Sequence, residues 1–313
     1  MACVHVVLSF RAAIVEGKTG VEGSVKAQEA PLFLLVHGAW HGAWCFGPLQ
    51  LALARLGGLS CPLELPGHGI DARIPSSAEI AEGAVSRAAG IDWHEAVASL
   101  AEAIADIRSF HRGPTIIVGH SAGGAMVSAL GERCPDLLDH LVYLCAFLLP
   151  PGLSTVAASM LPENGEALAP TLLKGPPDVL KALRIDPRSS NAEYRDLIKQ
   201  TFYSDMTDSQ ATAAMWQIVP DEPLPPDVIT TTAHRWGSVP RTFIVAERDR
   251  AIRPALQRRF ITETDAAFPE RQTDVLSIDS DHSPFFTATE SLAEMLVGIG
   301  RNTPRRDSEI APT

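Results

Sequence analysis

Residues 115–124 read Thr-Ile-Ile-Val-Gly-His-Ser-Ala-Gly-Gly. The Ile-Ile-Val run is typical of a buried strand, and an Ala- and Gly-rich helix is predicted directly after the serine. Gly119, Ser121 and Gly123 fit the pattern G-x-S-x-G, in which a tight strand-to-helix turn projects the serine hydroxyl and the glycines leave room for it. The N-terminus of the helix favours negative charge at this turn. The context predicts a nucleophilic serine; the alternative is a glycine-rich turn with an incidental serine.

Short apolar runs alternate with helical stretches on both sides of this turn. Strands are predicted at residues 32–36, 115–118, 141–149, 242–246 and 274–278, and helices at residues 92–107, 122–133 and 290–299. Repetition of strand and helix predicts an α/β fold with a mostly parallel central sheet covered by helices on both faces. Residues 31–150 and 239–300 are predicted to form this core.

One long segment, residues 151–238, interrupts the alternation. It has many prolines and no clear strand, and short helices are predicted at residues 178–185, 192–202 and 207–218. Because an insert after a strand is well placed to cover the strand ends, this segment is predicted to be a helical lid. Residues 1–30 are predicted to be a flexible N-terminal extension, and residues 301–313 a polar tail.

A serine hydroxyl is a weak nucleophile unless a base removes its proton. In the G-x-S-x-G architecture an acid and then a histidine follow the serine along the chain. His282 lies just after the strand at residues 274–278, which is where this base is expected. His234 lies in the predicted lid, and His140 begins a strand. We therefore predict His282 as the base.

The base needs a carboxylate that orients its ring. Asp249 follows the strand at residues 242–246 and is predicted as this acid. Glu247 competes for the role, and a turn aspartate flanked by arginines is the structural alternative. Asp279 and Asp281 lie too near the predicted base in the sequence to be first choices.

The attacked carbonyl oxygen becomes negative and needs two fixed hydrogen-bond donors. The backbone N–H groups of Ala122 and Ala39 are predicted to supply them, since one follows the serine and the other follows the first strand. Substrate contacts are predicted at Gly38, Trp40, Met160 and Trp216, with core packing as the alternative role of the last two. His37 and His41 have helical metal-ligand spacing but lack the glutamate of H-E-x-x-H, so neither a metal nor a cofactor is predicted.

Composition restricts the classes of protein to consider. The chain has 313 residues, of which 46% are hydrophobic, so disorder over most of its length is excluded. The net charge of 26 − 37 = −11 argues against a nucleic-acid partner. No run approaches the roughly 18 apolar residues of a membrane span. Five cysteines without a Cys-x-x-Cys pair indicate reduced thiols, and with them a cytoplasmic location.

Five stretches together resemble one branch of the α/β-hydrolase superfamily, the branch of plant methylesterases, hydroxynitrile lyases and related bacterial serine esterases. The stretches are LVHGAWHGAWCF (35–46), GHSAGG (119–124), AFLLP (146–150), AERDRAI (246–252) and DHSPFF (281–286). The resemblance covers residues 31–300 and implies the α/β-hydrolase fold. It also implies Ser121, Asp249 and His282 as the triad, with Ala39 and Ala122 as oxyanion donors.

Two departures from this resemblance bear on function. Hydroxynitrile lyases of the branch carry threonine at the place of Gly38 and lysine at the place of Ser283. Without that cation, the expected activity is that of a serine carboxylesterase acting through an acyl-enzyme. Its expected substrate is a small-molecule ester, such as a methyl ester, of a small to medium apolar acid. The alternatives are hydrolysis of another acyl or C–C bond, a lyase-like enzyme, or a ligand receptor; a homodimer is compatible with the sequence.

Overall fold

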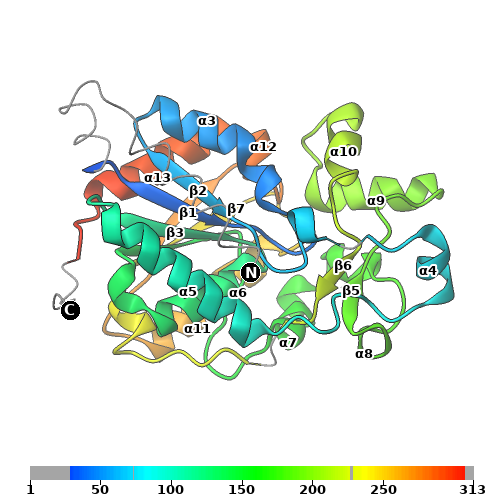
Figure 1. Ribbon diagram of the computed structural model, residues 1–313, viewed down its shortest axis with the longest axis horizontal. Coiled ribbons are helices and arrows are strands. Elements are labelled where there is room, and N and C mark those ends of the chain that lie inside the picture. Colours follow the sequence, from blue (N-terminus) through cyan, green and yellow to red (C-terminus); the bar gives the residue numbers. More distant parts are fainter. Residues whose placement is uncertain (1–28, 73, 226–227, 307–313) are drawn as a thin grey trace.

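A six-stranded parallel sheet forms the centre of the molecule, as predicted (Figure 1). The computed structural model describes residues 29–72, 74–225 and 228–306, so residues 1–28 of the predicted extension and 307–313 of the predicted tail lie outside it. The strand order is β2-β1-β3-β4-β7-β8. The strands are β1 (Leu32–Val36), β2 (Leu59–Leu63), β3 (Thr115–His120), β4 (His140–Leu144), β7 (Arg241–Ala246) and β8 (Asp274–Ile278).

Helices cover both faces of this sheet, and β1 shows why its sequence is continuously apolar. Leu32, Leu34 and Val36 point into one core, whereas Phe33 and Leu35 point into the other. The first core is completed by α5 (Trp93–Phe110), α6 (Gly123–Arg133) and α11 (Pro254–Ala267). The second is completed by α3 (Gly47–Arg55), α12 (Pro284–Thr287) and α13 (Thr289–Asn302). The two apolar layers explain the α/β pattern of the sequence.

The strand order reverses between β1 and β3, since β2 and β4 lie on their outer sides. Such a switch point leaves a crevice beyond the carboxyl ends of the two strands, where α/β proteins bind their ligands. Val36, the last residue of β1, pairs with Gly119 of β3. The loop after β1, residues 37–41 and here called the β1 loop, is thereby placed next to the turn that carries Ser121.

The segment between β4 and β7, residues 151–238, is here called the insert. Its elements are α7 (Thr155–Ser159), α8 (Pro177–Leu180), β5 (Ala182–Arg184), α9 (Ala192–Phe202), α10 (Asp208–Met215) and β6 (Asp221–Pro223). The helix predicted at 192–202 is confirmed. The helix predicted at 178–185 is wrong, because Lys181 adopts a left-handed φ of 58° that ends α8. The chain then forms β5, which pairs antiparallel with β6, so the insert does contain strands.

The strand predicted at residues 141–149 is too long. β4 ends at Leu144, and Cys145 has a φ of 39°, which a strand cannot continue. Residues 145–149 are nevertheless buried, which is why the apolar run continues in the sequence. The remaining elements are α4 (Ser77–Glu82) and 3-10 helices at Ala43–Phe46, Gly69–Asp71, Pro135–Leu137, Pro162–Asn164, Ala169–Leu172 and Trp236–Ser238.

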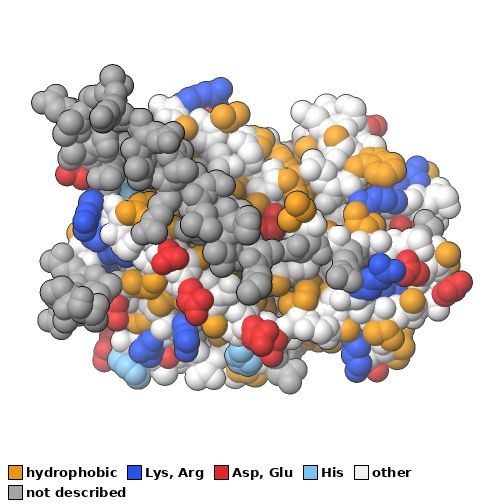
Figure 2. All heavy atoms as spheres, viewed as in Figure 1, with side chains coloured by type: hydrophobic (Ala, Val, Ile, Leu, Met, Phe, Trp, Pro, Cys, Tyr) orange, Lys and Arg blue, Asp and Glu red, His pale blue; other side chains and the backbone are white. Residues whose placement is uncertain are grey.

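The first residues of the polar tail predicted at 301–313 belong to a helix or contact the core. Arg301 and Asn302 belong to α13, and the Arg306 guanidinium donates to the carbonyl of Pro135 at 3.2 Å. Within the described ranges, every helix is too short or too polar to cross a membrane. The four cysteines described there are free thiols, and Cys3 lies outside them. Figure 2 shows acidic and basic side chains interspersed on one face rather than gathered by sign.

Candidate active site

Ser121 lies at a strained turn between β3 and α6. Its φ of 54° is left-handed, a conformation that costs a serine free energy and persists only where the surroundings impose it. Close packing imposes it here. A Cβ at Gly119 would lie 2.6 Å from the Val127 side chain, and a Cβ at Gly123 would lie 2.6 Å from the carbonyl oxygen of His37. The two glycines of the G-x-S-x-G pattern therefore allow the turn to form.

The structure brings Ser121, His282 and Asp249 together from three different strand ends. His282 Nε2 lies 3.0 Å from Ser121 Oγ, and His282 Nδ1 lies 2.8 Å from Asp249 Oδ2. A carboxylate accepts hydrogen bonds, so Nδ1 carries the proton and the Nε2 lone pair faces the serine hydroxyl. This tautomer is the one in which the imidazole can remove the Ser121 proton.

The Asp249 carboxylate is fully buried and held by donors on both oxygens. Oδ1 accepts from the backbone N–H groups of Ala251 and Ile252 at 2.7 and 3.0 Å, and Oδ2 accepts from Gln257 Nε2 at 3.0 Å. Sequence reasoning missed Gln257. It lies eight residues after Asp249, on the buried face of α11, where an amide among apolar side chains is the signal that would have pointed to it.

The competing residues lie elsewhere. Glu247 pairs with Arg258, and Asp279 pairs with Arg248, both at 2.6 Å. Asp281 is turned towards the backbone N–H of Ser283, 3.0 Å away. His234 is exposed on the insert. His282 thus has Asp249 as its carboxylate partner.

Two backbone N–H groups beside Ser121 are free to bind a ligand. Within the described residues, the amides of Ala39 and Ala122 donate to no other group. Both residues line the same cavity as Ser121. Gly38 permits the close approach of the β1 loop, since a Cβ there would lie 2.7 Å from Ser121 Cβ. The arrangement can hold a carbonyl oxygen next to the serine hydroxyl.

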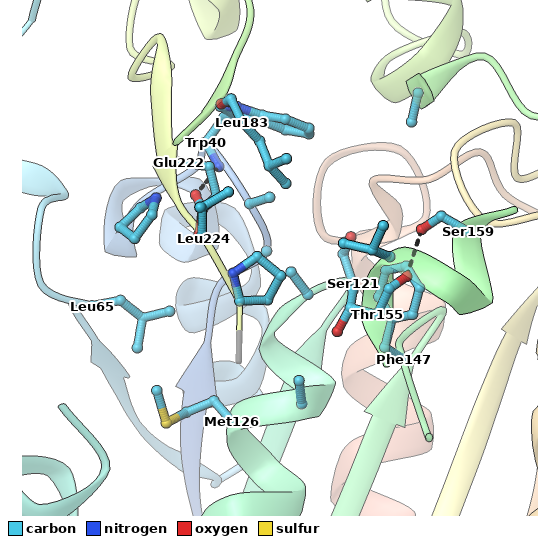
Figure 3. A pocket seen from close by; sticks show the side chains of 18 of the residues that line it. Trp40, Leu65, Ser121, Met126, Phe147, Thr155, Ser159, Leu183, Glu222 and Leu224 are labelled. Atoms are coloured by element: carbon cyan, nitrogen blue, oxygen red, sulfur yellow. Dashed lines mark hydrogen bonds between the residues drawn. The ribbon is translucent and has the colours of Figure 1, made fainter. Parts of the chain in front are cut away.

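The cavity in front of Ser121 measures about 270 Å³ and is largely apolar. Figure 3 shows it between the sheet and the insert, with Met126 and Phe147 from the core and Leu183 and Leu224 from the insert. Gly38, Trp40 and Met160 line it. The insert therefore supplies one wall of the space that the serine faces.

Trp216 is not part of this cavity, contrary to the sequence prediction. It follows the last residue of α10, its side chain is 64% exposed, and the guanidinium of Arg188 lies 5.5 Å from its ring. The reason is the orientation of α10. This helix turns Ala211, Ala214 and Met215 towards the interior of the insert, and Trp216 is left outside that buried face.

A model of the alpha/beta hydrolase family matches residues 33–295. The chain belongs to the alpha/beta hydrolase family. Methyl jasmonate esterase 1 of Vitis vinifera is 26% identical over 273 residues, which cover 85% of this α/β hydrolase and 95% of that relative. A pyrethroid hydrolase of Sphingobium wenxiniae is 29% identical over 195 residues, 62% of this chain and 66% of that relative.

Solved structures show the same fold. The crystal structure of a pyrethroid hydrolase from Sphingobium faniae matches this α/β hydrolase with a TM-score of 0.68 at 23% identity, over 87% of this chain and 98% of that chain. At this level of identity the likeness concerns the fold.

Several buried histidines surround the Ser121 site of this α/β hydrolase. His120 donates from Nε2 to the carbonyl of His282 at 2.8 Å, and burial lowers the pKa of His120 well below its usual value. Burial also lowers the pKa of His41 to about 3. His120, Cys145 and His282 place potential metal-ligand atoms within 4.8 Å of one another. Both ring nitrogens of His282 already have partners, so a metal ion bound by His282 would displace its contact with either Ser121 or Asp249.

Proposed function

We propose that this α/β hydrolase is a serine carboxylesterase, with Ser121 as nucleophile, His282 as general base and Asp249 as the acid that orients it. The observation that carries the proposal is the continuous chain of hydrogen bonds from Ser121 Oγ through His282 to Asp249. The relatives named above, among them a methyl jasmonate esterase and a pyrethroid hydrolase, support the same type of reaction.

The proposed reaction proceeds in two halves. Ser121 Oγ attacks the ester carbonyl carbon while its proton passes to His282 Nε2. The carbonyl oxygen becomes an oxyanion that accepts from the N–H groups of Ala39 and Ala122. The C–O bond to the alcohol then breaks, and His282 gives its proton to the leaving alkoxide. In the second half, water attacks the carbonyl carbon of the acyl-enzyme while its proton passes to His282. The bond to Ser121 Oγ then breaks, His282 returns the proton to the serine, and the acid is released.

The cavity supports the substrate class. Its apolar walls favour a small to medium apolar acid, and its volume of about 270 Å³ fits a compact acyl group with a small alcohol such as methanol. Among the described residues that line it there is no lysine or arginine. A hydroxynitrile lyase would need a cation for the leaving cyanide, so the lining favours the esterase over the lyase. Apart from the ester and water, the proposed steps use only groups of the chain itself.

Purified protein mixed with p-nitrophenyl esters is expected to release a burst of p-nitrophenol equal to the concentration of sites, followed by sustained turnover. Activity should be higher for the butyrate than for the hexadecanoate ester, because a sixteen-carbon chain exceeds the cavity. Burst and turnover are both expected to disappear in Ser121→Ala. Folded protein that gives neither would refute the proposed function, and a burst limited to one cycle would favour the ligand receptor.

A further inference from the structure

Trp40, in the β1 loop, has all three of its hydrogen-bonding groups paired with the insert. Its backbone N–H donates to Glu222 Oε2 at 2.7 Å, its carbonyl accepts from the N–H of Val219 at 2.9 Å, and its indole N–H donates to the carbonyl of Leu183 at 2.8 Å. Its φ of 61° is left-handed, a conformation that tryptophan rarely adopts. Contacts 143 to 182 residues away along the chain therefore maintain the shape of this loop.

Glu222 connects the β1 loop to a second core loop through His68. The same oxygen, Oε2, accepts from His68 Nε2 at 2.8 Å, while His68 Nδ1 lies 3.2 Å from the carbonyl of Pro66. Both ring nitrogens thus face oxygen acceptors, which is the arrangement of an imidazolium. Burial lowers the pKa of His68, but attraction to Glu222 and Glu64 outweighs it, and the pKa is raised.

Glu222 lies in a paired strand beside a buried ion pair. Glu222 pairs with Leu183 across the two-stranded sheet of β5 and β6. The neighbouring pair in the register, Arg184 and Asp221, forms a buried two-point ion pair at 2.6 and 2.7 Å. A carboxylate on such a support can define the position of a peptide group that binds it.

One peptide plane is fixed at both ends by these contacts. The Ala39–Trp40 peptide presents its N–H to Glu222 and its carbonyl to His41 Nδ1, which lies 2.8 Å away. His41 Nε2 in turn accepts from the hydroxyl of Tyr203 on the insert, at 2.7 Å. The next peptide towards the N-terminus carries the N–H of Ala39. Fixing the first plane restricts the direction in which that second N–H points.

We infer that Glu222 is a positioning residue, through which the insert holds the β1 loop so that the Ala39 N–H points at the oxyanion. The inference rests on the proposed function, because it assigns a support to the proposed oxyanion donor. Removing an oxyanion donor costs about 10²- to 10³-fold in kcat, and a misplaced donor costs part of that. Figure 3 shows Glu222 next to Trp40 on the cavity wall. If Glu222 instead bound the substrate directly, its removal would raise KM and leave kcat unchanged.

The test compares Glu222→Ala, Glu222→Gln and the control Glu166→Gln, a carboxylate on the insert that is 86% exposed. Glu222→Ala is expected to lower kcat about 10- to 100-fold with KM changed less than about 3-fold, because the oxyanion contact forms only in the transition state. Glu222→Gln should recover most of kcat, since its amide oxygen still accepts from both donors. Inhibition by phenylboronic acid, whose tetrahedral adduct also needs the donors, should weaken in Glu222→Ala by the factor lost in kcat/KM.

Each other outcome has a distinct meaning. A rise in KM with unchanged kcat in both Glu222 variants would make Glu222 a substrate ligand and overturn the inference. Unchanged kcat and unchanged boronate inhibition in folded Glu222→Ala would overturn it as well. A wild-type protein that neither hydrolyses esters nor binds phenylboronic acid would instead refute the proposed function. Thermal unfolding of all three variants, with Glu222→Gln as the milder change, shows whether lost activity reflects lost structure.

Discussion

Replacing His282 with alanine is expected to lower kcat for ester hydrolysis by roughly 10⁴- to 10⁶-fold, because Ser121 then has no base within reach. Asp249→Asn should cost roughly 10⁴-fold, since an amide that donates to the ring would turn the His282 tautomer the wrong way. The His282 variant should keep its fold, because the Asp249 carboxylate retains its three other donors, although loss of the buried ring should lower its stability. Steady-state kinetics and far-UV circular dichroism of the purified variants measure the two effects.

His234→Ala is the matched control for these variants. His234 is an exposed histidine on the insert, so its removal should leave kcat within about 2-fold of wild type. The assignment of roles would be wrong if His234→Ala abolished turnover while His282→Ala retained it. It would also be wrong if Glu247→Gln, which removes the competing carboxylate paired with Arg258, proved as damaging as Asp249→Asn.

Acid is expected to unfold this protein more steeply than its carboxylates alone would require. Four described histidines are buried in the neutral form, and burial lowers their pKa values: to about 3 for His41, about 4 for His111 and His140, and well below the usual value for His120. In the unfolded chain each titrates near roughly 6.5. Below that pH the unfolded state binds more protons than the folded state, so stability falls as the pH falls.

The expected slope is about 3–5 kcal/mol per pH unit near pH 5, since each such histidine contributes up to about 1.4 kcal/mol per unit. His68 does not add to this loss. Its raised pKa gives stability that is complete below the unfolded value and disappears as the pH rises through the folded value. Urea unfolding at pH 7, 6 and 5 measures the slope, and His140→Gln should reduce it while His234→Ala should not. Stability that stays constant from pH 7 to pH 5 would contradict the prediction.

The parts of the site that the sequence predicts are those governed by local steric rules. Gly119, Ser121 and Gly123 belong to a five-residue pattern that by itself indicates a left-handed turn at the serine, because its glycines mark positions where a Cβ would clash. The helix at residues 192–202 and the strand at residues 274–278 have the predicted bounds because their caps and patterns are local. His282 and Asp249 could be chosen because parallel strands bring their carboxyl ends to one edge.

The parts that escaped prediction depend on distant partners or on burial without regular structure. Glu222 accepts hydrogen bonds from His68 and Trp40, which precede it by 154 and 182 residues. A short sequence pattern cannot indicate contacts between residues so far apart in the chain. His68 has a local acceptor in the carbonyl of Pro66, yet its shorter contact is with Glu222. Residues 145–149 form a buried loop, and burial makes them as apolar as a strand. Hydrophobic periodicity cannot distinguish a buried loop from a buried strand over so short a run.

The closeness of Gly38 to Ser121 restricts the routes by which this scaffold can acquire new chemistry. Hydroxynitrile lyases of the resembling branch carry threonine at that place, but a Cβ on Gly38 would lie 2.7 Å from Ser121 Cβ and 2.9 Å from His120 Nδ1. The Ser121 Cβ is fixed by the backbone of the turn, and the buried His120 ring is held by its hydrogen bond to the carbonyl of His282. A mutational path towards a lyase must therefore move the β1 loop before it exchanges side chains. The anchoring of that loop by Glu222, Val219 and Leu183 makes the insert the segment where such a path has to begin.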